Sequence, residues 1–113
     1  MERTRSMWRW RMVAGMLAGL MVGIGVAAAG DPAQIAAGEK IYKKYKCAAC
    51  HMINGKGGKK ADDLSDVGTK RDAEWLKTYM VDPKSKFPKS KHPKFKGTDK
   101  DLDDLVAYMG SLK

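Results

Sequence analysis

The sequence has few of the residues that let a small protein build a core unaided. Of its 113 residues, only two are cysteine, two are histidine and 8% are aromatic. Two cysteines cannot form a disulfide framework, and the length excludes a Rossmann domain or a TIM barrel. Apolar residues make up 43% of the chain, but many of them lie before residue 30. The remainder is rich in lysine, so we expect one small domain stabilised by a metal or a large cofactor.

The first 29 residues predict an export signal. Four arginines within residues 3–11 precede an uncharged apolar stretch over residues 12–26, and alanines occupy 27–29. This order is typical of a secretory signal peptide, so we expect cleavage after Ala29 and a mature domain, residues 30–113, in the periplasm. The alternative is an uncleaved membrane anchor, because residues 12–29 just reach the length that spans a bilayer.

Positive charge is concentrated in one acid-free segment near the C-terminus. Residues 83–97 contain three prolines and no acid. Their six lysines are Lys84, Lys86, Lys89, Lys91, Lys94 and Lys96. A basic segment of this kind favours an acidic partner or an anionic membrane surface. Nucleic acid is a poor candidate because the mature chain is expected to be exported.

Hydrophobic periodicity and capping residues predict an all-α domain. Asp31 and Pro32 begin a helix that continues to about Cys47, with Gln34 completing a capping box. A second helix is expected over residues 72–81, and a third follows Thr98 and carries an apolar stripe to Leu112. Glycine-rich turns break the pattern over residues 52–71, and the sequence has no strand signal of useful length and no internal repeat.

Both cysteines lie in the pentapeptide Cys47-Ala48-Ala49-Cys50-His51. C-x-x-C-H is the attachment sequence of c-type haem. Two thiols at this spacing can reach the vinyl groups along one haem edge, while the adjacent His51 imidazole comes up beneath the iron. A covalently held haem would also supply the apolar bulk that the chain lacks. Two other readings stay open: a redox dithiol, and a zinc site formed by the cysteines with His51 and His92.

Residues 33–113 resemble a small class I cytochrome c. The resemblance rests on the stretches AGEKIYKKYKCAACH, NGKGG, DVGTKRDAEWLKTYMVDP, HPKF and DLDDLVAYMGSL. It implies a small all-α fold of three or more helices around one covalently attached haem, with the first and last helices crossing. It further implies that Gly38 and Tyr42 meet the last helix near Tyr108. Trp75 and Tyr79 would then flank the haem or its propionates.

The resemblance also points to the second axial ligand of the iron. The family usually has Met before Pro and close to Phe, whereas this chain has His92-Pro93-Lys94-Phe95. The resemblance therefore implies bis-histidine ligation by His51 and His92. Met80 is an alternative ligand and otherwise packs against the haem. The lysines that could compete at high pH, once deprotonated, are Lys89, Lys91 and Lys94.

One further departure concerns the second nitrogen of His51. The family pattern often has Pro shortly before L-x-x-V-G, where this chain has Ala61-Asp62-Asp63-Leu64. We expect a backbone carbonyl of this loop to orient the His51 ring instead.

These observations predict a soluble, monomeric periplasmic electron carrier rather than an enzyme. Two imidazole ligands leave no open position for a substrate, and they lower the reduction potential relative to methionine ligation. The six lysines of residues 83–97 would ring the haem edge and steer the protein to redox partners with acidic docking surfaces. The alternative is a ligand-binding or sensing haem protein, or the haem subunit of an enzyme complex.

Overall fold

The computed structural model describes residues 30–113, and it confirms an all-α domain. The predicted export signal at residues 1–29 lies outside the described residues. The α-helices are α1 (Pro32–Lys44), α2 (Val67–Lys70), α3 (Ala73–Val81) and α4 (Asp99–Gly110), and the 3₁₀ turns are η1 (Cys47–Ala49) and η2 (Pro83–Ser85). A two-stranded antiparallel ladder, β1 (Met52–Ile53) and β2 (Lys56–Gly57), is the remaining regular structure within this range.

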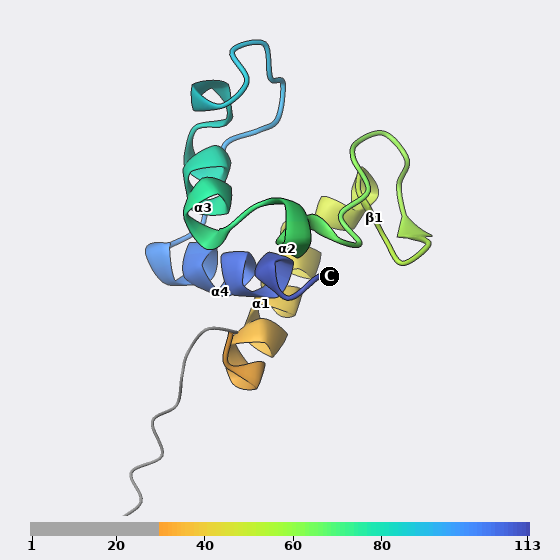
Figure 1. The fold of residues 1–113 in the computed structure, drawn as a ribbon, viewed down its shortest axis with the longest axis vertical. Helices are drawn as coiled ribbons and strands as arrows, with labels where there is room; N and C mark the ends of the chain where they lie inside the picture. Colours follow the sequence, from red (N-terminus) through yellow and green to blue (C-terminus); the bar gives the residue numbers. More distant parts are fainter. Residues whose placement is uncertain (1–29) are drawn as a thin grey trace, which may run out of the picture.

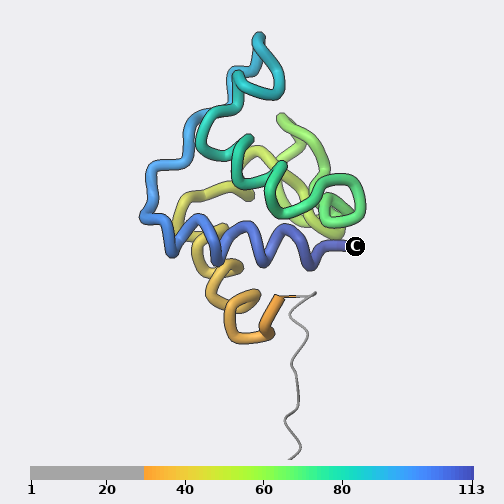
Figure 2. The backbone as a smooth tube through the Cα atoms, turned by 60° about the vertical axis from the view of Figure 1, so that its left-hand side comes forward, coloured from red at the N-terminus to blue at the C-terminus, as the bar shows by residue number. Residues whose placement is uncertain are grey.

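Helices α1 and α4 cross at close range, as the resemblance implied (Figures 1 and 2). The contact is centred on Gly38, where a Cβ atom would lie 1.9 Å from the Asp104 carbonyl oxygen and 2.6 Å from the Tyr108 Cβ atom. One turn later on α1, the Tyr42 ring packs against Tyr108 with 5.6 Å between ring centroids. Glycine at position 38 therefore sets the distance between the two helices.

The cap of α4 follows the sequence prediction, and α3 is capped in the same way. The Asp72 side chain accepts a hydrogen bond from the Trp75 amide, and the Thr98 hydroxyl accepts one from the Asp101 amide. Asp31 caps α1 by accepting from the Ala33 amide. Among the described residues, no hydrogen bond joins the Gln34 side chain to the Asp31 amide, so the expected capping box is not formed.

The first helix is shorter than expected, and one short helix was not foreseen. α1 ends at Lys44 because Lys46 adopts a left-handed conformation with φ of 57°, which no α-helix can continue through. Helix α2 has only four residues, too few for a periodic apolar pattern. Tertiary contact holds it in place: the Gly68 amide donates to the Leu112 carbonyl oxygen after α4, at 2.7 Å.

The apolar core is small and lies where α3 and α1 pack on α4. Its buried apolar residues among those described are Tyr42, Leu76, Met80, Leu102, Leu105, Val106 and Met109. Within residues 30–113, none of the helices has the length and hydropathy needed to span a bilayer. A core of this size agrees with a domain that needs a cofactor to complete it.

The basic segment between α3 and α4 is tied back to α3. The Phe95 amide donates to the Met80 carbonyl oxygen at 2.8 Å, and the Phe95 ring packs on Tyr45 with centroids 4.8 Å apart. This anchoring brings His92, three residues before Phe95, alongside Tyr79 of α3, with ring centroids 5.2 Å apart. The loop thereby faces the segment that contains both cysteines.

Candidate functional site

Two adjoining cavities lie between the cysteine segment, α3 and the basic segment. The first, of about 460 Å³, is lined mainly by α2, α3 and the 62–64 loop, and the second, of about 670 Å³, by the cysteine segment and residues 90–96. Both have His51, Asp62, Tyr79 and His92 in their walls. Each volume falls within the range of about 300–1,000 Å³ that is usual for cofactor sites.

The His51 ring is held by the loop that follows the hairpin. Its Nδ1 donates a hydrogen bond to the Asp62 carbonyl oxygen at 2.7 Å. A carbonyl oxygen can only accept, so the neutral ring carries its proton on Nδ1 and leaves Nε2 with a free lone pair. A backbone carbonyl from the 61–64 loop was the expected partner.

The His92 ring, on the opposite side of the cavities from His51, is also oriented by a hydrogen bond from its Nδ1 atom to a backbone carbonyl. Its Nδ1 donates to the Pro93 carbonyl oxygen at 2.8 Å, and its backbone amide donates to the Ser90 hydroxyl at 3.1 Å. The Ser90 hydroxyl lies 3.3 Å from the Tyr79 hydroxyl of α3. The His92 ring is therefore fixed by its own turn and by α3, with Nε2 left free.

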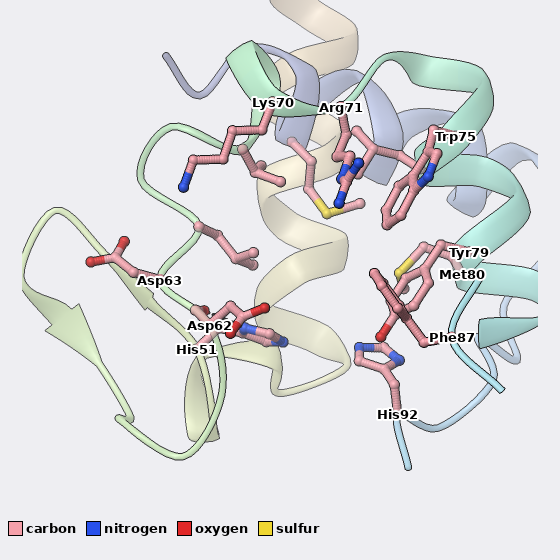
Figure 3. A pocket seen from close by; sticks show the side chains of 14 residues that line it. His51, Asp62, Asp63, Lys70, Arg71, Trp75, Tyr79, Met80, Phe87 and His92 are labelled. Carbon is pink, nitrogen blue, oxygen red and sulfur yellow. Dashed lines mark hydrogen bonds between the residues drawn. The ribbon is translucent and has the colours of Figure 1, made fainter. Parts of the chain in front are cut away.

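The two imidazoles face each other across the cavity, with 6.0 Å between ring centroids and 41° between ring planes (Figure 3). Two imidazoles that bind one metal ion from opposite sides, at nitrogen–metal distances of about 2 Å, have centroids about 6 Å apart. The spacing and the two free Nε2 atoms thus fit a single metal ion held between His51 and His92.

The cysteines lie on the turn that leads into His51. The amides of Cys50 and His51 both donate to the Cys47 carbonyl oxygen, at 3.2 and 3.0 Å, so the pentapeptide forms one tight turn. The two cysteines form no disulfide with each other, and both line the larger cavity. Burial raises the pKa of the Cys47 thiol, whereas a redox dithiol needs a lowered one. Among residues 30–113, no cluster of three or more His, Cys, Asp or Glu side chains could hold a bare metal ion, which disfavours the zinc reading.

Comparison with known proteins agrees with this geometry. The family model for cytochrome c matches residues 35–113. The chain belongs to the cytochrome c family. It carries haem c, and Cys47 and Cys50 provide the two thiols that hold it covalently.

Two relatives show how this cytochrome c compares with known members. It is 36% identical over 74 residues to the menaquinol:cytochrome c reductase cytochrome c subunit of Bacillus subtilis (strain 168), covering 66% of this chain and 27% of that protein. It is 33% identical over 90 residues to cytochrome c2 of Rhodoplanes tepidamans, covering 59% of this chain and 83% of that protein. The chain thus spans about a quarter of the Bacillus protein and most of the Rhodoplanes protein.

Aromatic side chains form one wall of the smaller cavity in this cytochrome c. Trp75 and Tyr79 stack with centroids 5.1 Å apart and planes 12° apart. Met80 and Met109 line the same cavity, and both are almost fully buried. Sequence reasoning missed Arg71 and Phe87, which also line it. Arg71 lies in extended backbone just before the α3 cap, so no helical spacing could have revealed it, and Phe87 gave no signal beyond being apolar within a lysine-rich segment.

The lysines around the larger cavity differ in part from those expected. Its lining includes Lys46, Lys60, Lys91, Lys94 and Lys96. Lys84, Lys86 and Lys89, which were expected to ring the same haem edge, line neither cavity. The rim of the cysteine-containing cavity is therefore assembled from three separate stretches of chain, and only half of the six-lysine segment contributes to it.

Proposed function

We propose that this cytochrome c is an exported, periplasmic electron carrier whose haem iron is ligated by His51 and His92. The observation that carries the proposal is the pair of opposed imidazoles, 6.0 Å apart, each with Nδ1 already hydrogen-bonded to a backbone carbonyl. The haem supplies reversible one-electron chemistry when bound. Export follows from the expected signal peptide, with cleavage after Ala29.

The protein's own residues act by fixing both ligands before an electron arrives. Hydrogen bonds from Nδ1 to Asp62 and Pro93 hold each ring in one tautomer and one orientation. Ligands that stay in place in both oxidation states keep the structural change on electron transfer small. If His51 and His92 both bound the iron, no coordination position would be open for a substrate, which favours a carrier over an enzyme.

His92 is better supported as the second ligand than Met80. The His92 ring faces His51 directly, whereas Met80 is 8% exposed and belongs to the apolar core. Tyr79, which stacks on Trp75 and lies next to His92, and Met80 both line the cavity and would pack against the haem.

The lysine-lined rim of the larger cavity supports docking to acidic redox partners. Lys46, Lys60, Lys91, Lys94 and Lys96 surround the cavity that contains both cysteines, where the attached edge of the haem would lie. Positive charge gathered at this edge steers partners of opposite charge and accelerates encounter at low ionic strength.

The ligand assignment is tested by His92→Met. An imidazole stabilises ferric iron more than a thioether does, so the variant is expected to raise the midpoint potential by on the order of 0.1 V. The measurement is a spectroelectrochemical titration, with a near-infrared iron–sulfur charge-transfer band as a second readout. Met80→Leu is the matched control and should leave ligation unchanged. An iron–sulfur band in the parent protein that disappears in Met80→Leu would refute the assignment.

A second candidate is supported by the Bacillus relative, a reductase subunit that is 36% identical over the matched region. On this reading the chain serves as the haem subunit of a larger complex rather than as a free carrier. Isolation of the protein from its native membranes in a stable complex with other subunits would favour the subunit role. Rapid stoichiometric carbon monoxide binding to the reduced protein would instead favour a sensor.

A further inference from the structure

The turn of the β1–β2 hairpin carries the single asparagine of the chain, Asn54, followed by a glycine. Ile53 pairs with Lys56, so Asn54 and Gly55 form a two-residue turn at one side of the domain (Figure 1). Both turn residues have positive φ, 50° for Asn54 and 81° for Gly55, which is typical of a type I′ turn. Asparagine and glycine suit this turn because both tolerate the left-handed conformation.

The groups of this turn that could react with each other are accessible. Both residues are exposed, and a Cβ atom added to Gly55 would have no neighbour within 4 Å. Asn54 is held through its own backbone amide, which donates to the Ser65 hydroxyl at 2.7 Å. Among the hydrogen bonds of residues 30–113, none involves the Asn54 side-chain amide or the Gly55 backbone amide. The Gly55 nitrogen can therefore approach the Asn54 side chain without first breaking a hydrogen bond.

One rotation of the peptide between Asn54 and Gly55 brings these groups into line. Such a rotation converts a type I′ turn into a type II′ turn, in which the first residue keeps a positive φ and takes a ψ of about −120°. At that ψ the Gly55 nitrogen eclipses the Asn54 Cβ atom, which is the arrangement that closing a five-membered ring requires. Gly55 then takes a negative φ, which glycine adopts as readily as a positive one. Glycine also lacks the Cβ atom that would hinder the approach of its nitrogen.

We propose that Asn54 is a site of spontaneous deamidation in the folded protein. Hydroxide removes the proton of the Gly55 amide, and the nitrogen attacks the carbonyl carbon of the Asn54 side chain. A new carbon–nitrogen bond forms, the bond to the side-chain nitrogen breaks, and ammonia leaves with a proton taken from water, which regenerates hydroxide. Water then opens the cyclic imide on either side of its nitrogen, giving aspartate or isoaspartate without any oxidant or reductant. The proposal is independent of the electron-carrier function.

The two products differ in what they do to the segment that orients His51. In isoaspartate the main chain runs through the former side chain and adds one carbon to a two-residue turn, whose length fixes the hairpin register. The hairpin holds the following loop, because the Leu64 amide donates to the Met52 carbonyl oxygen at 2.8 Å, and that loop supplies the Asp62 carbonyl to His51. Isoaspartate therefore loosens this loop, whereas aspartate keeps the normal main chain and only adds a negative charge.

The test is incubation of the haem-loaded protein at mildly alkaline pH, followed by digestion with trypsin. Cleavage after Lys46 and Lys56 releases residues 47–56, which contain both cysteines and Asn54, so the absorbance of the attached haem identifies the peptide. The parent is expected to give two additional haem peptides with one more negative charge, one of them a substrate for an isoaspartyl methyltransferase. The control is Asn54→Gln, which keeps the amide but would need a six-membered ring, and it should give one unchanged haem peptide.

Deamidated haem peptide that accumulates with time, and faster at higher pH, supports the proposal. Deamidation only after the protein is unfolded in guanidinium chloride would overturn it, because the folded turn would then block ring closure. Equal amounts of the acidic peptides from the parent and from Asn54→Gln would place the reaction elsewhere in the peptide. The isoaspartate form, separated by ion exchange, should unfold at a lower denaturant concentration than Asn54→Asp, which has the same charge and a normal main chain. Equal unfolding midpoints would contradict the effect on the loop.

Discussion

Gly38 is the residue whose replacement the helix crossing should tolerate least. The Cβ atom of Gly38→Ala would lie 1.9 Å from the Asp104 carbonyl oxygen, so α1 and α4 would have to move apart. We expect a loss of on the order of 3 kcal/mol in the free energy of unfolding, measured by chemical denaturation of the haem-loaded protein.

Gly110 provides the matched control for this substitution. It ends α4, and a Cβ atom there would have no neighbour within 4 Å. Gly110→Ala should leave stability unchanged or slightly increase it, because alanine favours the helix. Equal stability of the two variants would mean that the crossing distance is not set at residue 38.

At the scale of elements, the Asp104 side chain in the middle of α4 pairs with Lys100 near the start of the helix, and this pair predicts a pH dependence of stability. Its side chain is 8% exposed and pairs with Lys100 one turn earlier, with 2.7 Å between Nζ and Oδ2. Hydrogen bonds from Lys100 and then Gln34 lower the pKa of Asp104. Since the folded-state pKa is below the unfolded value of about 3.9, this carboxylate stabilises the fold above that pH and loses its contribution as pH falls through the lowered pKa.

The corresponding variant is Asp104→Asn. It should be less stable than the parent at pH 7, and the difference should shrink below about pH 4 as the parent's carboxylate becomes protonated. Urea denaturation across this pH range measures the effect. Lys100→Met should remove part of the same pH dependence. If the stability changes of Asp104→Asn and Lys100→Met simply add in the double variant, the two side chains are not coupled.

At the scale of the whole molecule, the haem completes the core. The buried apolar residues come mainly from α4 and the face of α3, and the segment from Cys47 to Val67 contributes none of them. We expect Cys47→Ala/Cys50→Ala, which cannot attach haem, to be largely unfolded, because the remaining apolar burial is too small for a domain of this size. Far-UV circular dichroism of the apoprotein would measure the loss, and a native-like helical spectrum would contradict it.

Local features of the fold could be predicted from the sequence alone. The caps at Asp72 and Thr98 depend on hydrogen bonds between residues three apart, and the haem attachment turn depends on five consecutive residues, so both can be identified without tertiary information. The end of α1 at Lys44 was missed because a left-handed lysine at position 46 leaves no mark in its side-chain type.

The sequence by itself therefore determined which chemical groups are present: two thiols and a histidine at fixed spacing, and a lysine-rich segment. It also determined where the helices begin. Only the tertiary structure decided the geometry of the site. The Asp62 carbonyl that orients His51 is a backbone group that every residue possesses, so no sequence pattern singles it out. The Phe95 amide ties the basic segment back to α3, and this contact places the His92 ring 6.0 Å from the His51 ring, measured between centroids. The same contact leaves Lys84, Lys86 and Lys89 outside the lining of the cavity that contains the cysteines. Contacts between segments that are distant in sequence depend on how the helices pack.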